Sequence, residues 1–391
     1  MLQEGIKLIS FQLVYLSKVG ISTIEYDVKS KKFVKSCPQK RQKLKICIVV
    51  SLIVGMVMNA SYSFLKVKLG VLYGVIMTML TFGYSTAIVT ILPFLIEPKQ
   101  VVNSLNMILR FEKMYFLGFR CSADQVRSWK RGMKCCFCVA IYGGVVASPT
   151  MVIITFFEPG LRPFLTSVFP PYNEAGLLVT AGRTIVFLAQ GWMIMVMGIG
   201  FCLVVGQLLL GTLQCVAMHV TTLRRCVKFN RIQFPDQLIR VLLIYKQLQI
   251  LVAQINLCCR QVLLPAVLVY LLSVNIFGVC TTVALKSELF RHPGNAIFPI
   301  LSMGSGLGIL ALGTMSGFIN KRSKECKVLM EKKALQVEPG LRSVNLLRKV
   351  ALSSAQMKIR FGSNYMEIST PLVMTSFCAR TVVRLLLLRG R

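Results

Sequence analysis

Six stretches of 20 to 40 residues without a single charged residue constrain this sequence most. A membrane-spanning helix needs about 20 largely apolar residues, because the hydrocarbon core of a bilayer is about 30 Å thick. A seventh stretch is apolar except for Arg380 and Arg384. The seven candidate spans are 46–65, 69–96, 135–157, 184–223, 261–285, 293–320 and 368–388. They predict an all-α membrane protein with seven transmembrane helices.

The basic residues predict the orientation of these helices. Lys and Arg outnumber Asp and Glu by 46 to 14, an excess that by itself is also typical of nucleic-acid binders. Counted in the segment before the first span and then in each of the six segments between spans, however, the Lys and Arg residues number 10, 2, 8, 2, 7, 2 and 11. Another 4 follow from Arg380 onward. Cytoplasmic flanks carry the excess of Lys and Arg. We therefore expect a cytoplasmic N-terminus, an outer C-terminus and no nucleic-acid partner.

The run 184–223 is long enough for two spans or for one long helix. Splitting it would place 7 and 11 basic residues outside and break the alternation, so a single helix is favoured. At 1.5 Å per residue this helix would be roughly 60 Å long, and part of it would project into the cytoplasm.

The segments between the spans predict a cytoplasmic helical bundle. Apolar residues recur at spacings of three and four at Leu238, Val241, Leu242, Tyr245, Leu248, Leu251, Val252 and Ile255. Such helices could lie on the membrane and bind anionic lipid through a basic face, but the stripe favours a bundle that continues the spans. The expected organisation is a cytoplasmic segment 1–45, six spans in 46–320 with cytoplasmic extensions 97–134 and 224–260, an anchor region 321–365, and a seventh helix with an outer tail in 366–391.

Catalytic chemistry is not evident in the sequence. There is no nucleophile–base arrangement, the chain has two histidines, and Gly304-Ser305-Gly306-Leu307-Gly308 lies in a span, where it indicates close helix packing. None of the 14 cysteines falls in an assigned outer loop, which suits a reducing compartment. We expect no enzyme activity, cofactor or metal site. Spans one to six hold no Asp, Glu, Lys or Arg, which argues against an ion-coupled transporter and leaves a receptor, a channel or a structural membrane protein.

The topology and the C-terminal residues resemble the arthropod gustatory and odorant receptor superfamily. The resemblance is carried by Leu346-Leu347-Arg348-Lys349-Val350, by Met357-Lys358-Ile359-Arg360-Phe361-Gly362-Ser363-Asn364-Tyr365 and by Thr370-Pro371-Leu372. They look like the family's last cytoplasmic helix, turn and final span. Many members carry Thr-Tyr, five mostly apolar residues and Gln-Phe in the final span. Here Arg380-Thr381 and Leu387-Leu388 stand in those places, and the rest of the chain matches only in topology and spacing.

The resemblance implies a chemosensory receptor of the plasma membrane. Such receptors are ligand-gated, non-selective cation channels opened by small-molecule tastants or odorants, and they are tetramers of one subunit or of a subunit with a co-receptor. The final span lines the pore, and a cytoplasmic anchor domain joins the subunits. Here the stripe in 236–256 and a helix over 341–355 would belong to that anchor.

A ligand pocket would lie in the outer halves of the other spans. Such a pocket needs aromatic and apolar walls with a few polar groups. Trp192, Tyr73 and Gln190 are the leading candidates, although aromatic residues near membrane ends are usually interface anchors. The full candidate set is Tyr73, Met77, Phe157, Gln190, Trp192, Phe277, Thr281, Phe298 and Met303.

The pore wall would come from the final span. Arg380 and Arg384, four residues apart, share one helix face. Facing a pore, they would repel cations; facing sideways, they could extend to the outer interface, and this second arrangement is favoured. The candidate pore residues are Thr375, Ser376, Arg380, Thr381, Arg384, Leu385 and Leu387.

Two other functions stay open. A G-protein-coupled receptor needs the opposite orientation, and the sequence lacks its Asp/Glu-Arg-Tyr and Asn-Pro-x-x-Tyr motifs. A non-conducting membrane protein of the same fold is compatible with the altered final span. Ligand-evoked current distinguishes a channel from the latter.

Overall fold

The computed structural model describes residues 2–18, 22–36, 40–66, 71–118, 123–170, 176–229, 235–285, 293–336 and 342–389. The expected outer loop 286–292 and residue 341 lie outside this part. The helices are α1 (Leu2–Lys18), α2 (Lys40–Lys66), α3 (Val71–Ile96), α4 (Pro98–Gly118), α5 (Ala123–Phe157), η1 (Leu165–Val168), α6 (Leu177–Cys202), η3 (Leu203–Leu209), α7 (Leu210–Phe229), α8 (Pro235–Cys259), α9 (Leu263–Leu285), η5 (Pro293–Ala296), α10 (Ile297–Gln336), α11 (Arg342–Leu352) and α12 (Thr370–Arg389). Two antiparallel hairpins join β1 (Ile24–Asp27) to β2 (Lys32–Lys35) and β3 (Arg360–Phe361) to β4 (Asn364–Tyr365).

The helices follow the apolar runs, so the fold is that of an all-α membrane protein. Each of the seven runs falls on a helix. The run 184–223 lies in one helical stretch of 53 residues, Leu177–Phe229, whose middle is the π-helical η3. The single long helix is therefore confirmed. Within the described residues, eight helices are long and apolar enough to cross a membrane, and the additional one is α8.

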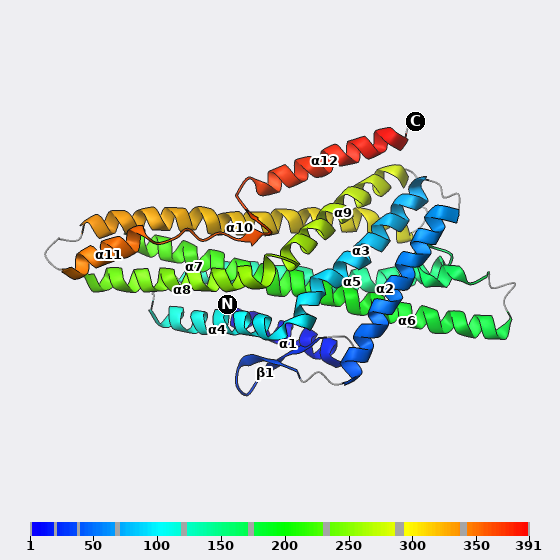
Figure 1. Ribbon diagram of the computed structural model, residues 1–391, viewed down its shortest axis with the longest axis horizontal. Helices are drawn as coiled ribbons and strands as arrows, with labels where there is room; N and C mark the ends of the chain where they lie inside the picture. The colour runs from blue at the N-terminus through cyan, green and yellow to red at the C-terminus, as the bar shows by residue number, and fades with distance from the viewer. Residues whose placement is uncertain are drawn as a thin grey trace.

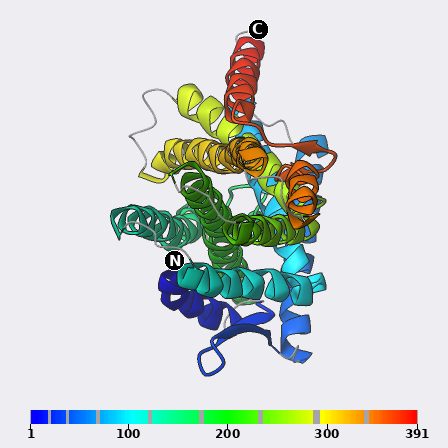
Figure 2. The ribbon, with the colours of Figure 1, turned by 90° about the vertical axis from the view of Figure 1, so that its left-hand side faces the viewer.

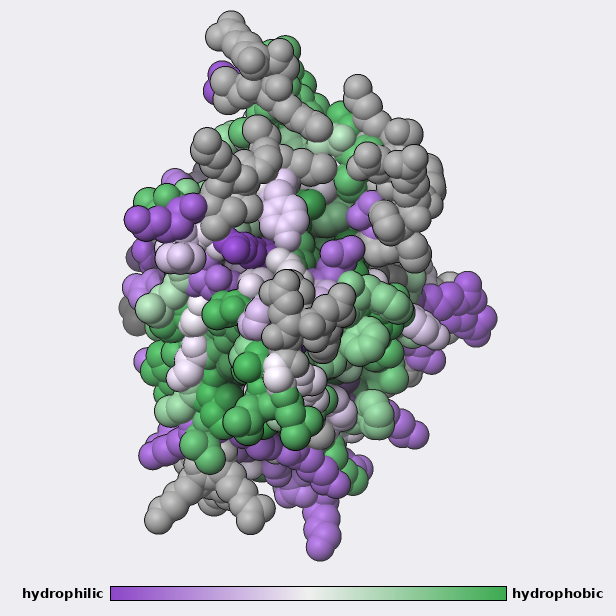
Figure 3. Space-filling model, turned by 90° about the vertical axis from the view of Figure 1, so that its right-hand side faces the viewer, coloured by the Kyte–Doolittle hydropathy of each residue, from purple (hydrophilic) through white to green (hydrophobic). Residues whose placement is uncertain are grey.

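The molecule is elongated and has two halves (Figure 1). We call one end the membrane half; it contains α2, α3, α5, α6, α9, the first part of α10 and α12. We call the other end the bundle; it contains α7, α8, α11 and the second part of α10 (Figure 1). Seen end-on from the membrane half, apolar side chains reach the surface over wide areas and hydrophilic ones gather toward the edge where the β1–β2 hairpin lies (Figure 3). That apolar surface suits contact with lipid tails.

Helix α8 belongs to the bundle, because its polar side chains bind irregular backbone. The Tyr245 hydroxyl donates a hydrogen bond to the Ala355 carbonyl over 3.0 Å, and the Gln249 amide donates to the same oxygen. Asn256 donates to the Lys358 carbonyl and accepts from the Arg360 N–H, over 2.8 and 2.9 Å. Irregular backbone exposed to lipid does not occur in the hydrocarbon core. The predicted stripe on this helix is confirmed: Leu238, Val241, Leu242, Tyr245, Leu248, Leu251, Val252 and Ile255 are all buried.

The expected helix over 341–355 ends earlier, at Leu352. The chain then runs through mostly extended backbone to Thr370, with the short β3–β4 hairpin on the way; we call residues 353–369 the linker. The bonds from Tyr245 and Gln249 hold the Ala355 carbonyl in this extended form. These tertiary contacts override the local apolar pattern that favoured more helix.

The β1–β2 hairpin is a second element that the sequence did not predict. The side-chain amide of Asn106, on α4, binds the backbone of β2 as a neighbouring strand would. It accepts a hydrogen bond from the Phe33 N–H and donates one to the Phe33 carbonyl, both over 2.8 Å. Four-residue strands are too short for alternation to be recognised against a helical background. Beside the hairpin, α1 buries Ile6, Ile9, Leu13 and Leu16 along one face.

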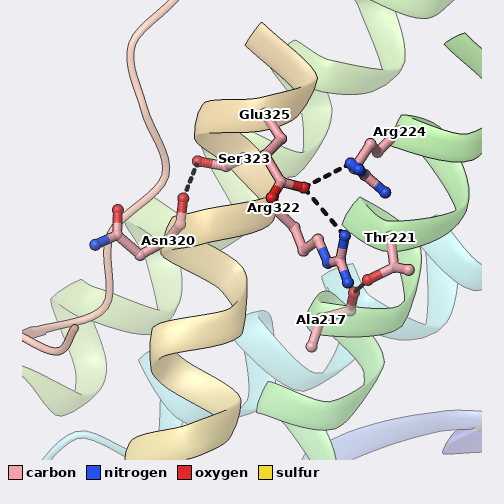
Figure 4. Close-up of polar contacts among 7 residues, drawn as sticks. All are labelled: Ala217, Thr221, Arg224, Asn320, Arg322, Ser323 and Glu325. Atoms are coloured by element: carbon pink, nitrogen blue, oxygen red, sulfur yellow. Dashed lines mark hydrogen bonds and ion pairs between the residues drawn. The ribbon is translucent and has the colours of Figure 1, made fainter. Parts of the chain in front are cut away.

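An ion-pair cluster joins α7 to α10 in the bundle (Figure 4). The Glu325 carboxylate lies 2.6 Å from Arg224 Nε and 3.0 Å from Arg322 Nη1. All three side chains are about a quarter to a third exposed. Solvent therefore screens the pairs, although two partners share one acid.

We expect Glu325→Gln to lower the free energy of unfolding by about 1 kcal/mol, because two arginines lose their common counter-ion. Glu331→Gln is the matched control: its single pair with Lys327, over 3.6 Å within one helix, is worth about 0.3–0.5 kcal/mol. Thermal unfolding of the purified variants measures both. Equal effects would show that the α7–α10 cluster adds nothing beyond an ordinary surface pair.

Candidate functional site

A cavity of about 330 Å³ lies inside the membrane half, between α3, α5, α6, α9 and α10. Its walls are apolar and aromatic, with Tyr84, Phe201 and Tyr270 as the large rings. Glycines and alanines of α3, α5, α6 and α10 leave the space free. Concave sites of this kind, in a size range from about 300 Å³ upward, are where proteins hold small molecules.

The three large rings of the cavity take part in two ring pairs. The ring centroids of Phe201 and Tyr270 are 4.2 Å apart, and those of Tyr84 and Phe164 are 6.2 Å apart in an edge-to-face arrangement. Phe164 is fully buried and comes from the loop between α5 and α6, at the end remote from the bundle. This loop, residues 158–170, therefore packs behind the cavity wall.

Polar side chains of α2, α3 and α6 hold the 158–170 loop in place. The Asn59 amide donates to the Pro163 carbonyl over 2.9 Å and to Phe164 O and Ser167 Oγ over 3.0 Å. The Tyr73 hydroxyl donates to the Gly160 carbonyl over 3.2 Å. Gln190 Oε1 accepts from the Leu165 N–H over 2.8 Å. The buried part of the loop around Phe164 needs such partners because its backbone groups are out of reach of water.

The nine predicted ligand residues lie on the helices that form the cavity, but none of them lines it. Tyr73 and Gln190 hold the loop instead. Met77, Thr281 and Phe298 are buried, and Trp192 and Phe277 pack half-buried against the core. Phe157 and Met303 point outward, and the two residues are 74% and 69% exposed. Their role in ligand binding stays a prediction.

The cavity lies nearer the middle of the spans than the predicted set. On α3 the lining residues run from Met79 to Ala87, and on α10 from Ile300 to Ser305. The sequence feature that marks the cavity is the presence of small residues that face aromatic ones at mid-span. A Cβ built on Gly83, for example, would lie 3.9 Å from the Tyr270 ring. From one sequence, the pairing of α3 with α9 could not be known.

The chemistry of the cavity suits a neutral, largely apolar molecule. No charged side chain is among the described residues that line it. The hydroxyl groups of Tyr84, Tyr270, Ser148 and Ser305 and the thiol of Cys202 provide the polar contacts. An ion would lose its hydration here without a counter-charge, which is costly.

Helix α12 rests on the rest of the chain by one side only. It stands apart in the end-on view (Figure 2) and packs against α9 and α10. Cys378 and Val382 are buried in that contact. Of the seven predicted pore residues, Thr375, Thr381 and Leu385 are half-buried, whereas Ser376, Arg380, Arg384 and Leu387 are exposed on this single chain.

The end of the linker and the start of α12 cross α10 at two glycines. A Cβ on Gly317 would lie 2.7 Å from the Ile368 backbone, and one on Gly313 would lie 2.5 Å from Pro371. Small residues permit this close approach of backbones in membrane proteins. The position of α12 therefore depends on these two sites.

Comparison with known proteins agrees with this architecture. No protein-family model and no curated protein sequence matches the chain. Among solved structures, it is similar to the insect olfactory receptor OR5 from Machilis hrabei in complex with eugenol, with a TM-score of 0.57 and 13% identity over 99% of both chains. The same receptor described without eugenol gives 0.54 and 13% over 98% of both. The chain has the fold of the insect olfactory receptors.

Proposed function

We propose that this protein is a chemosensory receptor of the insect gustatory and odorant receptor superfamily. The observation that carries the proposal is a closely lined apolar cavity within the olfactory-receptor fold. The similar receptor from Machilis hrabei was solved with eugenol, a small molecule. We infer that the cavity is the ligand site and that it takes neutral odorants or tastants of modest size.

We further propose a ligand-gated, non-selective cation channel in the plasma membrane, with four subunits around a pore lined by α12. The one-sided packing of α12 supports this arrangement, since its other side is left for a pore or for neighbouring subunits. The alternating charge supports a cytoplasmic bundle. Long helices that continue into a bundle, in the fold of the olfactory receptors, support a channel over a G-protein-coupled receptor.

The test is ligand-evoked current in a heterologous cell across a panel of neutral and charged tastants and odorants. We expect inward current with neutral apolar members and none with charged ones. If the protein reaches the cell surface but no compound of the panel evokes a current, whether it is expressed alone or with a co-receptor subunit, the non-conducting alternative is favoured. The exposed Arg380 and Arg384 are what keep that alternative open.

The Arg380 side chain offers a second measurement. If it faces lipid or the outer interface, Arg380→Gln leaves the reversal potential and the current amplitude unchanged, and this is the result we expect. A ring of arginines in the pore would repel cations, so a larger cation current in this variant would place Arg380 on the pore wall. Arg389→Gln, at the end of the same helix, controls for loss of charge.

A further inference from the structure

A second, polar groove of about 620 Å³ lies between α8, the start of α4 and the linker. Arg260 contributes from the chain just after α8, and Lys358 and Arg360 contribute from the linker. Glu97 is the acid among the described lining residues. Amide side chains form part of the wall, namely Gln100, Gln249, Asn256, Gln261 and Gln356, and the remaining lining residues are Val252, Ala253, Leu257, Ala355 and Met357.

The groove lies at the depth where membrane spans begin and end. Helix α3 ends at Ile96, directly before Glu97, and α9 begins at Leu263, shortly after Arg260. The linker that forms the opposite wall leads into α12 at Thr370. On the proposed orientation, this is the headgroup level of the cytoplasmic leaflet, where anionic lipids are concentrated.

The basic residues of the groove are held in place by contacts that leave their charge uncompensated. Arg260 Nε donates to the Gly362 carbonyl over 2.6 Å, and the Lys358 ammonium lies 3.9 Å from the centroid of the Tyr365 ring. Neither these two nor Arg360 forms an ion pair with a carboxylate in the described part of the chain. Gathering three cations around one acid costs electrostatic free energy unless an anion joins them.

We propose that this groove binds the phosphorylated headgroup of an inositol lipid. Guanidinium and ammonium groups bind phosphate oxygens, and the neutral amides of Gln100 and Gln261 match the hydroxyl groups of the inositol ring. Basic pockets beside transmembrane helices on the cytoplasmic side are where such headgroups bind. Because the linker is one wall of the groove, an occupied groove restrains the segment that carries α12.

The test is binding of a fluorescent phosphatidylinositol 4,5-bisphosphate to the purified full-length protein in detergent, followed by anisotropy. The binding measurement needs no current, so it rests on the proposed orientation but not on channel activity. The double variant Lys358→Gln/Arg360→Gln removes two cations and should weaken binding about 10- to 30-fold. This factor follows because each basic residue contributes about 1 kcal/mol to the attraction of an anionic lipid. Both side chains lie outside the core, and thermal unfolding verifies that the variant is folded.

Two further variants separate a built site from general attraction. Arg240→Gln/Lys332→Gln removes the same charge from exposed bundle positions outside the groove, with Arg240 about 14 Å along α8 from Gln249, the nearest lining residue, and should leave binding unchanged. Glu97→Gln should strengthen binding several-fold by removing the acid. Equal weakening in both double variants, or unchanged binding in Lys358→Gln/Arg360→Gln, would overturn the proposal.

Competition identifies the source of the phosphate. Unlabelled inositol 1,4,5-trisphosphate should displace the probe, whereas phosphatidylserine and inorganic phosphate at the same concentration should not. If inorganic phosphate displaces the probe to the same extent as inositol 1,4,5-trisphosphate, the groove binds free phosphate and the proposal of a lipid headgroup is overturned. Displacement by phosphatidylserine to the same extent would overturn recognition of the inositol headgroup.

Discussion

Gly317→Ala should lower the thermal stability of the protein and reduce its ligand-evoked current. An alanine Cβ would lie 2.7 Å from both Cα and N of Ile368 and 2.8 Å from the carbonyl carbon of Glu367. These are backbone atoms, so the linker has to move. Overpacking of this kind costs typically about 1–3 kcal/mol. Because the linker carries α12, its displacement also moves the proposed pore helix.

The matched control for the stability measurement is Gly304→Ala on the same helix, and because Gly304 lines the cavity this variant is compared in thermal unfolding only. No heavy atom lies within 4 Å of a Cβ built there. Alanine is favoured over glycine in a helix by about 1 kcal/mol, so this change should be neutral or slightly stabilising. If Gly317→Ala unfolds at the same temperature as Gly304→Ala and conducts normally, the close crossing does not position α12.

Gly83→Val is expected to raise the half-maximal agonist concentration about 10- to 100-fold. The new side chain extends toward Tyr270, where a Cβ makes an ordinary contact at 3.9 Å, and occupies space in the cavity. A ligand that competes with it meets an overpacking cost of about 1–3 kcal/mol, and 1.4 kcal/mol corresponds to tenfold in affinity. Dose–response curves in the heterologous cell measure the shift.

Gly74→Val provides the control, because it makes the same change on the same helix outside the cavity. Its nearest neighbour is also an aromatic ring atom at 3.9 Å, from Phe64. Both variants therefore share the same helix propensity and a comparable packing change. A similar shift in both would locate the ligand elsewhere than in the cavity described above.

The membrane architecture follows from the sequence because it depends on local pattern and charge. An uncharged run of sufficient length is constrained to be a helix in a bilayer. The apolar stripe from Leu238 to Ile255 is also a local pattern, and it predicted that α8 is a packed helix; these residues are buried in the structure. The long helix through η3 was predictable from the distribution of basic residues, since splitting the run would have placed 7 and 11 of them outside and broken the alternation.

The cavity and the linker depend on contacts between distant residues, which one sequence does not contain. Apart from Met303, which falls within the lining stretch of α10, the predicted pocket residues lie on the helices that form the cavity but toward their outer ends, because the membrane ends were the only reference for depth. Tyr73 and Gln190 looked like polar ligand contacts, whereas their hydrogen-bond partners are backbone groups of the 158–170 loop. The extended linker was missed because its partners, Tyr245 and Asn256, lie about a hundred residues earlier.

That separation has a consequence for biosynthesis. The amide and hydroxyl groups of α8 emerge from the ribosome long before the linker that binds them, and the closure of such a distant contact is slow. During this interval Tyr245, Gln249 and Asn256 have no linker backbone to bind, and the bundle is incomplete. The arrival of the linker thus completes the bundle, so a nascent chain that stalls before residue 353 presents an unfinished polar surface to chaperones and quality control.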